Sequence, residues 1–317
     1  MSDHHLEDII DRRRLRRKLT FWRVVSVLAA LILIFSLAYV STPDETFGFK
    51  ARPHVARVRV EGTVVEDEAL LDILEDIANS KAVKGLIVTV DSPGGTTTGG
   101  EAIHDAVRKV AAGKPVVAQV GTLAASAGYM IAVAADHIVA RQSSIVGSIG
   151  VLVQYPNVEE LLDKIGVDVR TIKSSPLKAE PSIFDTPPPG AEEMIRDMVL
   201  DSYDWFKNLV QERRTLSEQE VAKLADGSIF TGRQALERKL VDELGGEDAA
   251  KAWLVAQGLD PDLEVFEWRK PDLATGFLFS RAVARALGLD PLLRAPAEAL
   301  ADRLLLDGLI SLWHVDR

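Results

Sequence analysis

Apolar and polar positions follow two different periods along the middle of the chain. Runs typical of buried or half-buried strands fall at His54–Val60, Gly85–Val90, Val116–Val120, Ile138–Ala140, Ile149–Val153 and Asp168–Ile172. Apolar positions at helical spacing fall at Glu66–Asn79, Gly99–Ala112, Ser126–Ala134, Asn157–Ile165, Ala191–Arg214 and Ser217–Leu224. Strands that alternate with helices of this length predict an α/β fold with a largely parallel sheet.

Two later segments break this pattern. Lys173–Pro189 contains five prolines, which predicts a loop or flap. From Pro261 onward, leucine, alanine and arginine dominate, and prolines interrupt the helical periodicity. We expect amphipathic helices there, which pack on the core, form an oligomer contact or lie on a membrane surface.

The longest apolar run, Val24–Val40, contains 17 uncharged residues and follows a basic cluster. At about 1.5 Å per residue it spans roughly 25 Å, close to a bilayer core. Residues 1–23 carry seven Lys/Arg against four acidic residues, which predicts a cytoplasmic N-terminus and places the bulk of the chain across the inner (plasma) membrane. The alternative is a cleaved signal peptide, because Ser36-Leu37-Ala38 has small residues at cleavage-like spacing.

These patterns divide the chain into five parts. We expect a cytoplasmic basic segment (1–23), a transmembrane anchor (24–40), a linker (41–53), an α/β domain (54–258) and a helical C-terminal extension (259–317).

Composition narrows the chemistry. The absence of cysteine excludes thiol catalysis, thiolate-bound zinc and disulfides. The six histidines show no ligand spacing, so we expect no metal. A net charge of −10 argues against nucleic acid as a partner.

Ser126 stands among small residues, in Ala124-Ala-Ser-Ala-Gly-Tyr129, where a helix is expected to start. A serine nucleophile needs a base, and a lysine can supply it when its surroundings favour the neutral amine. His104 and His137 are weaker candidates, and Lys178 lies in the proline-rich loop. The rival hydroxyls are Ser143, Ser144 and Ser148.

A glycine turn, Asp91-Ser-Pro-Gly-Gly95, follows the second expected strand. Its structural interpretation is a tight strand–helix turn. Its functional interpretation is an oxyanion hole, in which backbone N–H groups face a substrate carbonyl oxygen. The stretch Gly94–Gly100 lacks the lysine and hydroxyl of a phosphate-binding loop.

Taken in order, these motifs resemble the signal peptide peptidase A family of membrane-bound serine–lysine peptidases, which have the Clp protease/crotonase type of α/β fold. The matching stretches are Asp91–Gly95, Ala124–Tyr129, Gly147–Val151, Thr171–Lys178 and Asp226–Gly245. With the anchor, the resemblance covers roughly residues 20–255.

The resemblance implies roles for six residues. Ser126 would be the nucleophile and Lys178 the general base, with Ser148 orienting the lysine. The oxyanion hole would consist of Gly94, Gly95 and the Ala127 amide.

Two departures from the family pattern affect these roles. Ala127 replaces the glycine usual after the serine, and it keeps the amide N–H. The loop Ser174–Pro181 lacks the Gly and Lys-Asp common around the family's base, which leaves Lys173 as the alternative to Lys178.

The leading hypothesis is therefore a membrane-anchored serine endopeptidase. It would cleave hydrophobic peptides, such as remnant signal peptides, through an acyl-enzyme and without a cofactor. The resemblance also implies a homo-oligomeric ring in which neighbouring copies help build the substrate grooves. The alternatives are a crotonase-like acyl-CoA enzyme and a catalytically silent membrane-associated scaffold.

Overall fold

The computed structural model describes residues 18, 21–23, 25–26, 28, 52–269 and 310–312. The chain forms two compact units, Met1–Arg52 and Pro53–Arg317. Apart from Arg52, the described residues of the first unit are helical. The predicted anchor at residues 24–40 lies almost wholly outside the described residues. Within the described part of the chain, no helix is long and apolar enough to cross a membrane.

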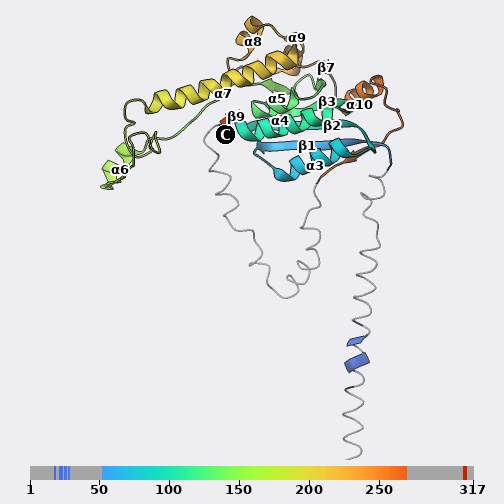
Figure 1. Ribbon diagram of the computed structural model, residues 1–317, viewed down its shortest axis with the longest axis horizontal. Coiled ribbons are helices and arrows are strands. Elements are labelled where there is room, and N and C mark those ends of the chain that lie inside the picture. The colour runs from blue at the N-terminus through green and yellow to red at the C-terminus, as the bar shows by residue number, and fades with distance from the viewer. Residues whose placement is uncertain are drawn as a thin grey trace, which may run out of the picture. The chain divides into compact units, whose positions relative to one another are not determined.

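The second unit is built on a nine-stranded sheet, shown in Figure 1. Its strands are β1 (His54–Val64), β2 (Val83–Thr96), β3 (Val116–Ala125), β4 (His137–Ala140), β5 (Ile145–Gly147), β6 (Ile229–Thr231), β7 (Glu243–Leu244), β8 (Val265–Glu267) and β9 (Ile310–Leu312). The main order is β6-β5-β3-β2-β1-β8, with β4 beside β3, β7 beside β4, and β9 beside β2. Among the described strands, only β6 and β9 pair in antiparallel fashion, so the sheet is largely parallel, as the sequence predicts.

Eight helices connect the strands in the described part of this unit. They are α3 (Glu68–Asn79), α4 (Thr97–Ala111), α5 (Ala127–Ala132), α6 (Glu159–Ile165), α7 (Ala191–Arg214), α8 (Glu218–Leu224), α9 (Gly232–Glu237) and α10 (Glu247–Ala256). Asp67 caps α3, and Ser217 with Glu220 forms the capping box that the sequence signals for α8.

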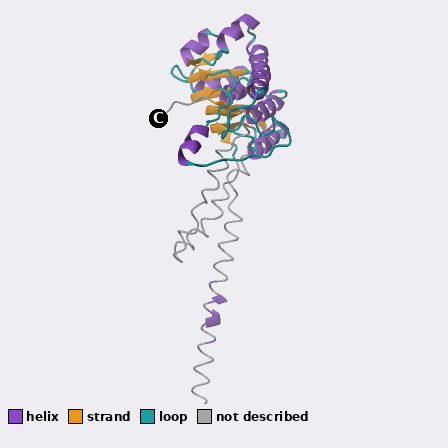
Figure 2. Cartoon of the chain, turned by 90° about the vertical axis from the view of Figure 1, so that its left-hand side faces the viewer, coloured by secondary structure: helices purple, strands orange, loops and turns teal. Residues whose placement is uncertain are grey.

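The two faces of the sheet carry different layers. The larger apolar core lies on the face covered by α3, α4 and α5, where Val88, Val90 and Val120 meet Ile103 and Met130. A smaller cluster on the other face packs Ile87 and Val117 against Leu254 of α10. Figure 2 shows helices gathered along one side of the strands. Successive residues of β2 are buried on both faces, which explains its continuous apolar run.

Two predicted strands are wrong. Residues 149–153 are irregular apart from an isolated bridge at Leu152, because β3 already pairs with β5 at Ile145–Gly147. Residues 168–172 form no strand, and the side chain of Ile172 is fully exposed. An alternating pattern becomes a strand only where another strand offers its edge, and the described residues offer none here.

The start of the expected helical extension belongs to the sheet. Strand β8 pairs with β1, and the indole of Trp268 donates to His54 Nε2 at 3.0 Å. Strand β9 joins β2. Residues 270–309 lie outside the described part of the chain.

Candidate active site

Ser126 and Ser148 are brought together by one rung of the parallel sheet. Ala125 at the end of β3 pairs with Gly147 at the end of β5, and each serine is the next residue. The Ser126 N–H donates to the Gly147 carbonyl at 2.9 Å. Because neighbouring strands lie about 4.8 Å apart, both serines emerge at the same carboxyl edge. Both are buried.

Both serines have a backbone conformation that is costly for residues other than glycine. Ser126 has φ 57° and ψ −120°, and Ser148 has φ 52°. Such conformations cost about 1–3 kcal/mol each and cluster at functional sites. Ala179, next to Lys178, also has a positive φ, of 59°. Three of the five such residues in the described chain therefore lie at or beside the residues that the sequence singles out.

The glycine turn lies beside the start of α5. A Cβ on Gly128 would meet the Ser92 carbonyl oxygen at 2.8 Å, so the first turn of α5 touches the end of β2. Gly94 has φ 108°, and a Cβ on Gly95 would lie 1.9 Å from the Val64 carbonyl oxygen. Both positions therefore require glycine.

The hydrogen bonds of the glycine turn show which of its backbone N–H groups already has an acceptor. Ser92 Oγ donates to the Gly62 carbonyl at 2.6 Å and accepts from the Gly94 N–H at 3.1 Å. The Gly94 amide is thus already engaged by a side chain. Ala127 is the first residue of α5, where amides have no acceptor within the helix.

The helix that follows Ser126 is held firmly by long-range contacts. The Tyr129 hydroxyl donates to the Leu240 carbonyl at 2.8 Å, and burial raises the pKa of this phenol. Arg213 of α7 donates to the carbonyls of Val133 and Ala135, which follow the end of α5. These bonds satisfy carbonyl groups that the helix end would otherwise leave without partners.

The two candidate lysines have different surroundings. Lys173 forms an ion pair with buried Glu180, and its hydrogen bond lowers the pKa of that carboxyl group. Lys178 is exposed, and the described residues give its Nζ no hydrogen bond or ion pair. Among the described residues, no hydrogen bond or ion pair therefore joins Lys178 to Ser126 or Ser148. Figure 1 shows α6 and the start of α7, which flank this loop, projecting beyond the sheet.

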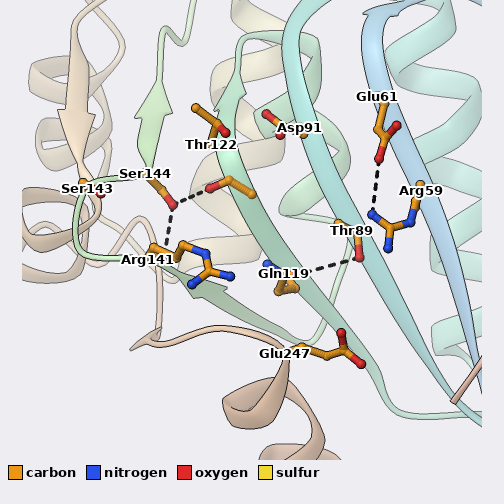
Figure 3. Close-up of a pocket in the computed structure, with 11 residues that line it drawn as sticks. Arg59, Glu61, Thr89, Asp91, Gln119, Thr122, Arg141, Ser143, Ser144 and Glu247 are labelled. Carbon is orange, nitrogen blue, oxygen red and sulfur yellow. Dashed lines mark hydrogen bonds and ion pairs between the residues drawn. The ribbon is translucent and has the colours of Figure 1, made fainter.

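The rival hydroxyls occupy a different place. Ser143 and Ser144 line a polar cavity of about 460 Å³, together with Asp91 and Gln119, and Ser126 does not line it. Figure 3 shows these lining residues. Ser144 Oγ donates to the Gly121 carbonyl at 2.6 Å and accepts from the Arg141 N–H. Asp91 accepts from the Leu123 N–H at 3.2 Å. These contacts support the strand that leads to Ser126, so the cavity is part of its scaffold.

The two histidines considered as bases, His137 and His104, make packing and polar contacts with residues other than Ser126. His137 stacks on Trp253 with ring centroids 5.0 Å apart and contacts Glu243. His104 is buried in α4, and its Nδ1 lies 2.9 Å from Asp105.

Sequence reasoning missed β9, which pairs with the glycine turn itself. Its tripeptide is too short to stand out among the leucine-rich residues around it.

A serine on a strained turn, beside a glycine turn at the carboxyl ends of parallel strands, defines an α/β serine hydrolase of the Clp protease type. Comparisons with known proteins agree. The model of peptidase family S49 matches residues 108–258, and the Clp protease model matches residues 60–146.

Three relatives place the chain more closely. A Synechocystis sp. protein named as a protease is 38% identical over 231 residues, which cover 71% of this chain and 83% of that protein. Protease 4 of Haemophilus influenzae is 32% identical over 84% of this chain and 46% of its own length. An Enterococcus faecium protein named as a signal peptide peptidase, SppA, is 35% identical over 65% of this chain and 60% of its own length.

The chain belongs to peptidase family S49 and is a serine peptidase. It spans less than two thirds of the length of the last two relatives. The resemblance in the motifs is thereby confirmed, and these matches support a peptidase over an acyl-CoA enzyme or a silent scaffold.

Proposed function

We propose that the protein is an endopeptidase in which Ser126 attacks the peptide bond and Lys178 is the general base. The observation that carries this proposal is the strained Ser126 turn beside Gly95 and the Ala127 amide. Attack by Ser126 Oγ on the carbonyl carbon would give an acyl-enzyme, with the hydroxyl proton passing to the lysine and then to the leaving amine.

The oxyanion would be held by backbone amides. In this conformation the Gly94 N–H donates to Ser92 Oγ and Gly95 is paired within the sheet, whereas Ala127, as the first residue of α5, has no acceptor for its amide within the helix. Each such donor contributes about 3–4 kcal/mol to stabilising the transition state.

The base would come from a second copy of the chain. Lys178 belongs to a projecting segment, residues 152–200, which we call the arm. The arm exposes ten large apolar side chains: Leu152, Leu161, Ile165, Val167, Ile172, Leu177, Phe184, Met194, Met198 and Leu200. Such a surface favours burial against a neighbouring copy, and packing of this kind can carry Lys178 to the neighbour's Ser126 and Ser148.

The proposed substrates are extended hydrophobic peptides, such as remnant signal peptides, on the outer side of the membrane. The name of the Enterococcus faecium relative and the apolar run after the basic N-terminal cluster support this location and substrate class.

Peptide cleavage by paired variants tests the mechanism. Ser126→Ala is expected to lower kcat/KM by more than about 10³-fold, and Lys178→Ala by about 10²–10⁴-fold. The matched controls are Ser143→Ala and Lys164→Ala, which remove an exposed hydroxyl in the polar cavity and an exposed amine on the arm. Cleavage that survives Ser126→Ala would overturn the mechanism, and equal losses in Lys164→Ala would remove the special role of Lys178.

A further inference from the structure

The loop of the arm that carries Lys178 is closed at its base by a buried ion pair. Lys173 and Glu180 flank residues 174–179, and the Lys173 ammonium group donates to Glu180 Oε1. The Glu180 side chain is 2% exposed, whereas residues 174–179 between the two partners are all exposed. Because a glutamate is seldom buried unless its charge is paired, the ion pair explains how Glu180 is held inside.

The second oxygen of the Glu180 carboxylate fixes the chain on the far side of the loop. Glu180 Oε2 accepts from the Ser182 N–H at 2.8 Å. The next residue, Ile183, accepts through its carbonyl from the N–H of Val158, just before α6, at 2.9 Å. The hydrogen bonds from Lys173 and Ser182 lower the pKa of the Glu180 carboxyl group. One carboxylate therefore ties together the two ends of the loop.

The hydrogen bonds inside the loop are too weak to hold it alone. The Lys178 N–H donates to the Ser175 carbonyl at 3.2 Å, and the Glu180 N–H donates to the Leu177 carbonyl at 3.4 Å. Ala179, which follows Lys178, has φ 59°. A residue other than glycine keeps such a conformation only where the surrounding structure fixes it. The ion pair at the base of the loop supplies that constraint.

The ion pair also uses both of the charges that would compete with Lys178. Lys173 is engaged by Glu180, whereas the Lys178 Nζ has no hydrogen bond or ion pair among the described residues. A lysine acts as a base in its neutral form, and a nearby carboxylate favours the charged form. Glu180 stands two positions from Lys178 and directs its charge to Lys173, which favours Lys178 over Lys173 as the base.

We infer that Lys173 and Glu180 are positioning residues, whose ion pair closes the loop 174–179 and presents Lys178 to Ser126 in one orientation. The closure of the loop is independent of the catalytic mechanism, whereas the presentation of Lys178 rests on the proposed function. A misplacement of about 1 Å can lower a rate about 10²-fold, so a small loosening of the loop is enough to slow the chemical step.

Amide hydrogen exchange, measured by mass spectrometry on the full-length protein, tests the closure. Glu180→Gln keeps the shape of the side chain and removes its charge, and we expect exchange across residues 174–182 to become about tenfold faster or more. The matched control is Asp168→Asn, which removes the charge from an exposed ion pair with Arg170 on the same arm and should leave this exchange unchanged. Unchanged exchange in Glu180→Gln would overturn the closure.

Steady-state kinetics test the presentation of Lys178. Glu180→Gln and Lys173→Met are expected to lower kcat about 10–100-fold and to change KM less than about twofold, because a loosened loop misplaces the base without touching the substrate. Lys173→Arg keeps the charge and should retain most of the activity, and Asp168→Asn should cleave like the wild type. A raised KM with unchanged kcat would overturn the positioning role.

Reversal of the two charges separates a specific pair from general damage to the arm. Lys173→Glu and Glu180→Lys each place like charges at the base of the loop, so each should be less active than Glu180→Gln. The double variant restores opposite charges and should be at least about fivefold more active than either single reversal. The rescue is partial, because an ammonium group cannot accept from the Ser182 N–H. A double variant no more active than the single reversals would overturn the pairing.

Lys178→Ala separates this inference from the proposed function. If Lys178→Ala cleaves peptides like the wild type, the proposed base is refuted, and the exchange result still decides whether the ion pair closes the loop. If Lys178→Ala is inactive while Glu180→Gln is fully active despite faster exchange, the positioning role is refuted and the proposed function stands.

Discussion

At the residue scale, the site depends on two serines whose backbone conformations cost free energy. Ser126 and Ser148 hold positive φ values because their amides are tied to the carbonyls of Gly147 and Ser228, at 2.9 and 2.8 Å. The surrounding sheet thus fixes conformations that an isolated loop would abandon. The strand register places both serines at the same carboxyl edge of the sheet.

A buried histidine makes stability depend on pH. His104 packs in α4 with Asp105, Arg108 and Arg213 as its charged neighbours, and desolvation lowers its pKa below the ordinary value of 6.5. Within the described residues, its Nε2 has no hydrogen-bond partner. The unfolded chain therefore binds a proton more readily than the folded chain, and stability falls as the pH drops below about 6.5.

Urea unfolding between pH 7.5 and 5.0 measures this effect. The wild-type chain should lose up to about 1.4 kcal/mol per pH unit more than His104→Leu, which keeps the volume and removes the titrating group. Because both chains share every other ionisable group, equal slopes would contradict the role given to His104.

At the element scale, the end of β2 has to approach β1 closely to form the turn. Gly95→Ala would place a methyl group 1.9 Å from the Val64 carbonyl oxygen, and the backbone would have to move. We expect a loss of about 1–3 kcal/mol in unfolding free energy and a larger loss of activity, since the glycine turn beside Ser126 is part of the proposed oxyanion hole and would move.

The matched control for this variant is Gly113→Ala, at a position where an added Cβ meets nothing within 4 Å. It should leave peptide cleavage unchanged. Calorimetry and peptide cleavage on both variants give the comparison, and equal behaviour of the two would contradict the close-approach argument.

The sequence predicted correctly those elements that are marked by a local pattern, such as helical periodicity or a capping box. The helix Ala191–Arg214 has the bounds expected from its periodicity, and the capping box at Ser217 marks the start of α8. The fold class and the juxtaposition of Ser126 with the glycine turn also follow from strand order. The strand predicted at 168–172 failed because strand formation depends on a partner far away in sequence.

Contacts between residues far apart in the sequence could not be predicted, because local patterns do not identify the distant partner. The β9–β2 pairing joins residues more than 200 positions apart, and no local pattern in Ile310–Leu312 announces its partner. Lys178 lies on the arm, and no residue spacing reveals that this segment projects beyond the sheet.

At the scale of the whole molecule, the proposed contact between copies accounts both for the arm's exposed apolar side chains and for Lys178, whose Nζ has no hydrogen bond or ion pair among the described residues. If the catalytic serine and the catalytic lysine of one active site come from two neighbouring chains, a Ser126→Ala subunit still carries an intact lysine and a Lys178→Ala subunit still carries an intact serine. Mixing the two inactive proteins under conditions that exchange subunits should restore up to about a quarter of wild-type activity, because some contacts then join an intact serine to an intact lysine.

The control for this mixture is a preparation of either variant with itself, which should stay inactive. Ile172→Asp on the arm should weaken both assembly, measured by light scattering, and the restored activity. A mixture that never regains activity, although its subunits exchange, would place the base within a single chain.

The most direct test of the account is the position of the covalent adduct formed by a fluorophosphonate, located by mass spectrometry of peptides from the labelled full-length protein. The account predicts one modified residue, Ser126, with labelling abolished by Ser126→Ala and slowed by Lys178→Ala. An adduct on Ser143, Ser144 or Ser148 instead, or peptide cleavage that persists after Ser126 is fully modified, would contradict it.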